Sequence, residues 1–515
     1  MTISLLLDIA QSMDAERLAV GSRAAGITTT RLRDLAGSGA TVLSQAGARS
    51  LAFVGVNGPA FPVAMFASAR AGVPLAPLNY RLSASALAAQ IGRLDAPLIV
   101  TDPEYAATVG NLGRPVISTD DLLRVAGGPE TGSEPVDDEN AAAVMLFTSG
   151  TTADPKCVIL RHRNLESYVL RTVEPVSRGT DEAALVSVPP YHIAGVGTVL
   201  TNVFGGRRLL YLPGFGPQAW IDTVRSEEVT FAMVVPTMLA RIVEVLAGTA
   251  TELPTLRSIA YGGARMPEPL LRRALELLPE VDFVNAYGLT ETSSTIAVLG
   301  PGEHRAALAS DSPAKRGRLG SVGRLIDGVE GEIRDDHGRA LPSGSIGELW
   351  VRGAQVSGEY VEIGSVLDPD GWFPTRDRAR FDDDGYLYVL GRTDDVIIRG
   401  GENISPAEIE DVLLLNPAVA EAAVVGVPDE QWGERIGAVV VLVDGCRADP
   451  GELREWVRVR LRSSKTPDWI VVRGELPQTD TGKVLRRSLA GEFADLGETT
   501  PWPSPDDGHG PRRSG

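Results

Sequence analysis

Short apolar runs alternate with stretches of helical spacing through the first part of the chain. Residues 51–56 and 97–101 have the length and composition of buried strands, and residues 59–71 between them have helical spacing. This strand–helix–strand order predicts parallel strands covered by helices. Similar apolar runs recur at residues 184–188, 208–212, 231–236 and 258–261. The sequence therefore predicts an α/β fold whose large N-terminal region contains parallel sheets.

The pattern changes near Gly347. Residues 347–352 alternate in the manner of a strand, and residues 386–390 form another predicted strand after an Asp-Gly turn. We interpret this stretch as a small, β-barrel-like part of the large region. Residues 391–395 are polar and turn-like, and they are a plausible hinge.

A compact α+β module is predicted after this hinge. Residues 406–415 and 450–462 have helical spacing, and two strand-like runs lie between them. The end of the chain is rich in Pro, Gly, Ser and Asp, a composition typical of disorder. We expect a large domain over residues 1–393, a small mobile C-terminal domain over 394–490, and a disordered tail over 491–515.

Charge and cysteine content exclude several function classes. The formal net charge of −18 disfavours binding to nucleic acid or to an anionic membrane. The chain has only two cysteines, Cys157 and Cys446, which argues against an extracellular disulfide framework. We see no basic, apolar leader and no run long enough to span a bilayer. We expect a cytoplasmic protein without a membrane span, as a monomer or homodimer.

A loop rich in glycine and hydroxyl groups follows the apolar run 142–147. Backbone N–H groups in such a loop bind phosphate, and its lysine, Lys156, adds a positive charge. The loop differs from the ordinary P-loop because Cys157, rather than Ser or Thr, follows the lysine. Taken alone, the segment is equally compatible with a polar surface turn.

A second polar segment, residues 285–291, follows the apolar pair at 283–284. Tyr287 can stack on a base, Thr290 can contact a phosphate, and Glu291 is a hard oxygen ligand suited to magnesium. Each residue is also compatible with a strand end followed by a capped turn.

Two further polar segments are ambiguous alone. Asp377 and Arg392 have the chemistry to bind a ribose diol or a phosphate, although exposed Asp and Arg more often form surface ion pairs. Lys483 stands on a glycine loop from which a lysine can reach a distant site. In isolation, that loop is a solvated basic turn.

Together, the order and spacing of these segments resemble the adenylate-forming superfamily. That superfamily includes acyl-CoA synthetases, aryl-CoA ligases, firefly luciferases and peptide-synthetase adenylation domains. The resemblance covers residues 32–489, and it is strongest for bacterial acyl-CoA ligases. Further matching segments lie at residues 72–81, 190–195, 261–264 and 400–410.

The resemblance implies a role for each matching position, with ATP, Mg²⁺ and coenzyme A as ligands. The phosphate loop includes Thr148, Ser149, Gly150, Thr151, Thr152 and Lys156. The adenine side includes Gly262, Gly263, Ala264 and Tyr287, and the ribose contacts are Asp377 and Arg392. Thr290 matches the α-phosphate contact, Glu291 the magnesium ligand, His192 the gate to the thiol tunnel, Gly400 and Gly401 the tunnel loop, Asp394 the hinge, and Lys483 the mobile catalytic lysine.

These roles agree with the chemistry of adenylation. A carboxylate is a poor nucleophile toward an anionic phosphate, so magnesium, Lys156 and Lys483 are needed to neutralise charge. The acyl-AMP is then a mixed anhydride that a thiol attacks. The implied activity is AMP-forming acid–thiol ligation, with the acyl group passed to coenzyme A.

The sequence departs from the family pattern at several positions. Ala153 and Cys157 stand where the phosphate loop usually has glycine, and Arg376 replaces the glycine before the ribose-binding aspartate. Arg399 replaces a common lysine, and the segment from Glu359 to Gly371 is shortened. We interpret Cys157 as a residue that fills space rather than as a nucleophile.

Several alternatives for substrate and acceptor stay open. No aspartate near Tyr191 and His192 is placed to bind an α-amino group, so an ordinary α-amino acid is disfavoured. Small or apolar pocket candidates favour an aliphatic or aryl acid: His192, Val196, Val235, Gly262, Thr292 and Ser293. Alternatives are nitrous acid as the substrate, a carrier-protein thiol or an amine as the acceptor, and an inactive nucleotide-binding paralogue. Arg454, Arg458, Arg460 and Arg462 form either a basic docking patch for a carrier or a solvated helix face.

Overall fold

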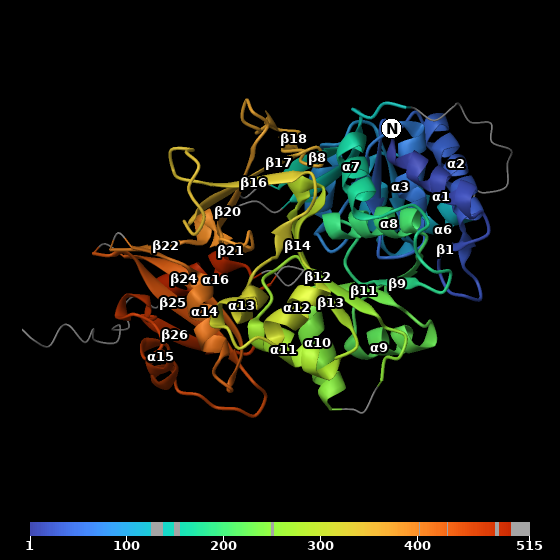
Figure 1. The fold of residues 1–515 in the computed structure, drawn as a ribbon. Helices are drawn as coiled ribbons and strands as arrows, with labels where there is room; N and C mark the ends of the chain where they lie inside the picture. The colour runs from blue at the N-terminus through green and yellow to red at the C-terminus, as the bar shows by residue number, and fades with distance from the viewer. Residues whose placement is uncertain are drawn as a thin grey trace, which may run out of the picture.

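Two large sheets and their helices form the N-terminal region. The fold comes from a computed structural model that describes residues 1–124, 137–148, 155–248, 252–400, 402–429, 431–478 and 484–495. One hydrophobic core, from Ile3 to Leu319, joins the two sheets. Figure 1 shows these layers in blue to yellow, with the C-terminal domain beside them in orange and red.

The first sheet has the order β19-β18-β8-β7-β4-β3-β5-β6. The strands from β7 to β6 are parallel, whereas β8, β18 and β19 extend one edge in antiparallel pairings. In sequence order its strands are β3 (Ser50–Val54), β4 (Leu75–Pro77), β5 (Pro97–Thr101), β6 (Val116–Ser118), β7 (Ala142–Thr148), β8 (Lys156–Arg161), β18 (Glu359–Tyr360) and β19 (Gly364–Ser365).

The second sheet has the order β15-β14-β13-β12-β11-β9-β10-β1-β2. Its central strands are parallel, as predicted, and antiparallel strands flank them at both edges. In sequence order its strands are β1 (Leu18–Val20), β2 (Ile27–Thr28), β9 (Ala183–Val186), β10 (Arg208–Tyr211), β11 (Phe231–Val234), β12 (Ser258–Gly262), β13 (Asp282–Leu289), β14 (Ser294–Leu299) and β15 (Arg324–Leu325).

Helices cover the faces of these sheets. Helix α3 is buried along most of its length, and it ends at Gly72, whose φ of 69° gives the left-handed cap that glycine favours. The longer helices are α1 (Ile3–Met13), α2 (Thr29–Gln45), α3 (Ala60–Ala71), α4 (Ala84–Gly92), α7 (His162–Thr172), α8 (Ile193–Gly205), α9 (Pro217–Ser226), α10 (Pro236–Ala247), α11 (Glu268–Leu277) and α12 (Pro301–Leu308). Shorter helices are α5 (Ala106–Val109), α6 (Thr119–Arg124) and α13 (Pro313–Arg316).

The antiparallel part predicted beyond Gly347 is a small sheet of order β16-β17-β20-β21. It has its own core, which also includes Ile296 and Ala297 from β14. The short helix η5 (Thr393–Asp395) follows this sheet at the predicted hinge. The strands are β16 (Val329–Arg334), β17 (Gly347–Gly353), β20 (Phe373–Phe381) and β21 (Leu387–Arg392).

A separate α+β domain forms the C-terminal part. Its sheet has the order β23-β22-β25-β24, with β26 parallel to β25, and its two core clusters contain only residues after 396. The boundary at 393/394 stays a prediction. The elements are β22 (Ile397–Arg399), β23 (Glu402–Ile404), α14 (Pro406–Leu414), β24 (Val419–Asp429), β25 (Gly433–Leu442), α15 (Pro450–Arg458), β26 (Trp469–Arg473) and α16 (Arg486–Asp495).

The expected tail begins too early. Residues 491–495 belong to α16, and the Phe493 side chain is only 1% exposed in the C-terminal core. The prolines of the tail begin at residue 501, whereas the segment 491–495 continues the helix and buries Phe493. Residues 496–515 lie outside the described part of the chain.

Candidate active site

Strands β7 and β8 bring the two ends of the predicted phosphate loop together. Thr148 pairs with Lys156, and the Thr148 hydroxyl donates to the Lys156 carbonyl at 3.4 Å. The Lys156 ammonium lies 5.5 Å from the centre of the Tyr360 ring. The predicted loop residues Ser149, Gly150, Thr151 and Thr152, and the departure at Ala153, fall outside the described residues.

Cys157 lies directly after this loop and is 1% exposed. Burial raises the pKa of its thiol to about 12, so the sulfur is protonated at neutral pH. This supports the interpretation of Cys157 as a residue that fills space.

The strand pair β12 and β13 places the adenine-binding candidates beside the catalytic segment. Gly262 lies opposite Ala286 in parallel register, and a Cβ at Gly262 would lie 2.3 Å from the Ala286 carbonyl oxygen. A side chain there is excluded by this close approach of two backbones. Gly263 follows with φ at 79°, so the chain turns immediately before Ala264.

A tight reversal after β13 fixes Thr290 and Glu291 in the short helix η3 (Thr290–Thr292). A Cβ at Gly288 would lie 1.8 Å from the Ser294 carbonyl oxygen, and Ser294 itself has φ at 107°. The Thr292 hydroxyl bonds to Leu289 and Ser294 within this turn. Thr292 therefore stabilises the reversal, although the sequence placed it among the pocket candidates.

Tyr287, Asp377 and Arg392 meet in one hydrogen-bonded group. The Tyr287 hydroxyl and the Arg392 guanidinium both donate to the Asp377 carboxylate, Arg392 at 3.0 Å. Arg392 also donates to the Thr375 carbonyl at 2.6 Å. Burial and the Asp377 charge raise the pKa of Tyr287, which keeps its phenol protonated. The residues predicted to hold base and ribose are thus adjacent.

Electrostatics favour a charged Arg392. Burial by itself would lower the pKa of this guanidinium, but Asp377 and Glu291 outweigh it and raise the pKa. The neighbouring Arg376 has φ at 63°, which explains why a glycine suits this position in the family pattern.

The segment 357–362 connects the catalytic turn to the phosphate loop, and our sequence reasoning missed it. The N–H groups of Ser357 and Gly358 donate to the Glu291 carbonyl at 2.8 and 3.3 Å. The Tyr360 hydroxyl donates to Glu291 Oε1 at 2.8 Å. The only feature of the sequence that pointed to this segment was its shortened length beyond Glu359, relative to the family pattern.

His192 lies at the N-terminus of α8, beside Tyr191. Their ring centres are 4.7 Å apart, and Tyr80 packs against Tyr191 at 5.7 Å. Among the pocket candidates, Val235 faces the backbone of Gly263, since its Cγ1 lies 3.5 Å from a Cβ placed there. The role of His192 as a gate to a thiol tunnel stays a prediction.

The structure describes only some of the residues predicted for the thiol tunnel and the mobile lysine. Gly400, with φ at 57°, turns the chain between β22 and β23, and its N–H donates to the Trp432 carbonyl at 2.8 Å. Gly401 and Lys483 lie outside the described residues. The C-terminal domain contacts the large domain near Ala264, where Arg265 donates to the Ala407 carbonyl at 2.9 Å and pairs with Asp411.

The residues present fit a magnesium ion that is held mainly by phosphate. Within the described ranges, no three His, Cys, Asp or Glu side chains gather as a ligand cluster. Glu291 offers one carboxylate, with Oε1 engaged by Tyr360. Magnesium usually keeps several waters and takes one or two carboxylates together with substrate phosphates, so a single glutamate is sufficient.

Two family profiles match the chain. The family described as AMP-binding enzyme matches residues 8–361, and the AMP-binding enzyme C-terminal domain matches residues 408–483. The chain therefore belongs to the AMP-binding enzyme family, the adenylate-forming superfamily indicated by its motifs. It is an enzyme of the AMP-forming acid–thiol ligase class.

Named relatives include a feruloyl-CoA synthase of Amycolatopsis sp, 35% identical over 86% of this chain and 88% of the relative. A fatty acid–[acyl-carrier-protein] ligase, ScoC, of Streptomyces coeruleorubidus is 31% identical over 86% of each chain.

Solved structures agree with the fold. The o-succinylbenzoate CoA synthetase of Bacillus subtilis, in complex with ATP and magnesium ion, matches with a TM-score of 0.81 and 29% identity over 94% of this chain and 98% of that one. The amide bond synthetase McbA of Marinactinospora thermotolerans matches with a TM-score of 0.84 and 29% identity, over 95% and 99% of the two chains.

None of the helices in the described ranges combines the length and apolar character that crossing a bilayer requires.

Proposed function

We propose that the protein activates an aliphatic or aryl carboxylic acid as acyl-AMP and transfers the acyl group to coenzyme A. One observation carries this proposal: Lys156, Tyr287, Glu291 and Asp377, which come from three separate motifs, are linked by direct contacts that include Tyr360 and Arg392. ATP joins a base, a ribose and a triphosphate in one molecule, so its binding needs these side chains close together.

In the first half-reaction, a carboxylate oxygen of the acid attacks the α-phosphorus of ATP, and pyrophosphate leaves. Lys156 and the loop N–H groups bind the phosphates, Thr290 contacts the α-phosphate, and Asp377 with Arg392 holds the ribose. Magnesium, held by Glu291, would neutralise phosphate charge. Lys483 would bridge the carboxylate and the α-phosphate in the transition state.

In the second half-reaction, the thiolate of coenzyme A attacks the acyl carbon, and AMP leaves with the shared electron pair. The proposal includes rotation of the C-terminal domain about Asp394, so that the Gly400–Gly401 loop replaces Lys483 at the cleft. The contact of Arg265 with α14 would then break and re-form in each cycle.

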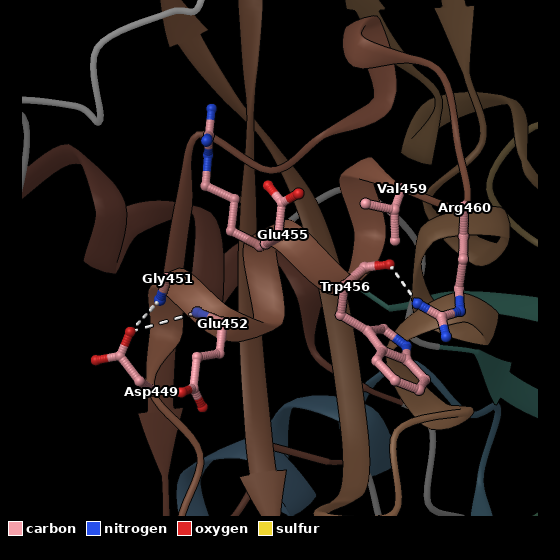
Figure 2. Close-up of a pocket in the computed structure, with 8 residues that line it drawn as sticks. Asp449, Gly451, Glu452, Glu455, Trp456, Val459 and Arg460 are labelled. Carbon is pink, nitrogen blue, oxygen red and sulfur yellow. Dashed lines mark hydrogen bonds between the residues drawn. The ribbon is translucent and has the colours of Figure 1, made fainter.

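The surface of α15 favours free coenzyme A over an acidic carrier protein. The basic patch considered for Arg454, Arg458, Arg460 and Arg462 is partly neutralised by acidic neighbours. Arg458 pairs with Glu455 at 2.6 Å and Arg462 with Glu402 at 3.7 Å, whereas Arg460 packs over the Trp456 ring and keeps its charge. A pocket beside α15 is lined by Asp449, Glu452 and Glu455 as well as by Arg454 and Arg460. Figure 2 shows the three acidic side chains.

Two other acceptors are supported by relatives. The carrier-protein ligase and the amide bond synthetase named above have this fold, so a carrier thiol and an amine are second candidates. The experiment is a pyrophosphate-release screen over aryl, aliphatic and amino acids, with nitrite included. The best acid is then tested with coenzyme A, a phosphopantetheinylated carrier or an amine.

The proposal predicts acid-dependent pyrophosphate release and a coenzyme A thioester of the expected mass. If only nitrite were turned over, nitrous acid would replace a carboxylic acid as the proposed substrate. If a product formed only with a carrier or an amine, that compound would replace coenzyme A as the proposed acceptor. No pyrophosphate release with any member of the panel would contradict adenylation by this site.

A further inference from the structure

We propose that Tyr360 is a positioning residue for the phosphate part of the site, holding the Glu291 carboxylate by a hydrogen bond and the Lys156 ammonium against its ring. The inference rests on the proposed function, because it assumes that Glu291 and Lys156 serve MgATP. It assigns a role to a residue from a segment far away in sequence.

The two contacts of Tyr360 are on different parts of its side chain. Its hydroxyl donates to Glu291 Oε1 at 2.8 Å, whereas its ring centre lies 5.5 Å from the Lys156 ammonium. A cation over an aromatic ring is stabilised by about 0.5–2 kcal/mol, depending on burial. One residue therefore sets the positions of an anion and a cation that both face the phosphates.

The backbone around Tyr360 is anchored to strand β8, directly after Lys156, and to Glu291. Tyr360 pairs with Val158 in β8, and the N–H of Val361 donates to the Cys157 carbonyl at 2.9 Å. The Glu362 carboxylate accepts the Cys157 N–H at 3.2 Å. On the other side, Ser357 and Gly358 hold the Glu291 carbonyl. The ring thus has a fixed position relative to the catalytic turn and the phosphate loop.

Two flanking ion pairs strengthen this anchoring. Arg161 of β8 contacts both carboxylate oxygens of Glu359, at 2.6 and 2.8 Å. Arg93 pairs with Glu362 and donates to the Pro155 carbonyl at 2.8 Å. Tyr360 lies between these two pairs, which tie the segment to both sides of the loop exit.

The hydroxyl of Tyr360 orients the carboxylate that would hold magnesium, because it donates a hydrogen bond to Glu291 Oε1. Loss of a partner that orients a metal-binding carboxylate typically lowers metal affinity about 10- to 100-fold.

The test is Tyr360→Phe, which keeps the ring over Lys156 and removes only the hydroxyl. The matched control is Tyr386→Phe, because Tyr386 also donates to a glutamate, Glu303 Oε1, at 2.8 Å and lies outside the proposed site. ATP binding without acid is titrated calorimetrically at increasing magnesium concentrations. We expect Tyr360→Phe to need about tenfold more magnesium for tight ATP binding, and the control to match the wild type.

A double-variant experiment separates this role from packing. In a Glu291→Gln background, Tyr360→Phe should add little to the magnesium requirement, since the carboxylate that it positions is already gone. Unchanged magnesium dependence in Tyr360→Phe, or a lower requirement, would overturn the proposal. If the wild type bound no MgATP at all, the proposed function itself would fail instead.

Discussion

Asp377→Asn is the sharpest single test of the base and ribose site. The Asp377 side chain is 8% exposed, and it accepts from both Tyr287 and Arg392. An asparagine of the same shape has one acceptor oxygen and one NH₂ group. Because Arg392 has only donors, the amide oxygen must face Arg392 and the NH₂ group must face the Tyr287 oxygen. The substitution therefore changes charge and polarity with little change in volume.

The expected magnitude follows from these contacts. A hydrogen bond to a charged group contributes about 1.5–3 kcal/mol, against about 0.5–1.5 kcal/mol for a neutral one. Each ribose hydroxyl that donates to Asp377 would exchange an ionised acceptor for a neutral one, a difference of about 1–1.5 kcal/mol per hydroxyl. Since 1.4 kcal/mol is about tenfold in affinity, the KM for ATP should rise about 10- to 100-fold.

The assay is pyrophosphate release at varied ATP, with the KM for the acid measured in parallel. Asp382→Asn is the matched control, because Asp382 accepts from Tyr388 at 3.3 Å in the turn between β20 and β21. The KM for the acid should be unchanged in both variants. The KM for ATP should be unchanged in Asp382→Asn and raised in Asp377→Asn. An ATP KM within twofold of the wild type for Asp377→Asn would refute the ribose assignment.

Three further predictions follow from other parts of the molecule. Burial, with the N-terminal ammonium, lowers the pKa of His162 from 6.5 to about 4, so between these pH values the unfolded chain binds a proton that the folded chain excludes. Chemical denaturation should therefore show the unfolding free energy falling by about 1.4 kcal/mol for each pH unit from 6.5 toward 4. The variant His162→Gln should flatten this slope. Arg376→Gly should raise the unfolding free energy by about 0.5–1 kcal/mol, since it relieves a left-handed residue at φ 63°, and a loss of stability would contradict this. Lys483→Ala should slow adenylation by about 100-fold or more and spare thioester formation from synthetic acyl-AMP; equal loss of both half-reactions would contradict the domain rotation.

The sheet architecture was predictable because it depends on local pattern. The apolar runs near Leu51 and Leu98 became the parallel strands β3 and β5, and the helical run between them became α3. Boundaries moved by one to a few residues, since strand ends depend on pairing partners rather than on composition. The tail differed because the burial of Phe493 in the C-terminal core depends on packing against distant strands, which the local sequence does not indicate.

The site was predictable only where motifs carry it. The chemistry of Glu291 and Asp377 was visible in their segments, but the bond between Tyr287 and Asp377 joins residues 90 positions apart. The contact of Glu362 with Cys157 spans 205 positions, so no local pattern indicates it. By contrast, the i,i+3 spacing of Glu455 and Arg458 on a predicted helix indicates their pairing. This pairing weakens the basic patch considered for the arginines at and after α15.

The central claim is that the acid itself attacks the α-phosphorus of ATP. The most direct measurement uses the best acid from the screen, labelled with ¹⁸O in both carboxylate oxygens, together with ATP, magnesium and coenzyme A. Mass spectrometry of the products should find one ¹⁸O atom in AMP and none in pyrophosphate, because the attacking oxygen stays on the α-phosphate when the thiol displaces AMP. Label in pyrophosphate or phosphate, formation of ADP, or unlabelled AMP would contradict the account.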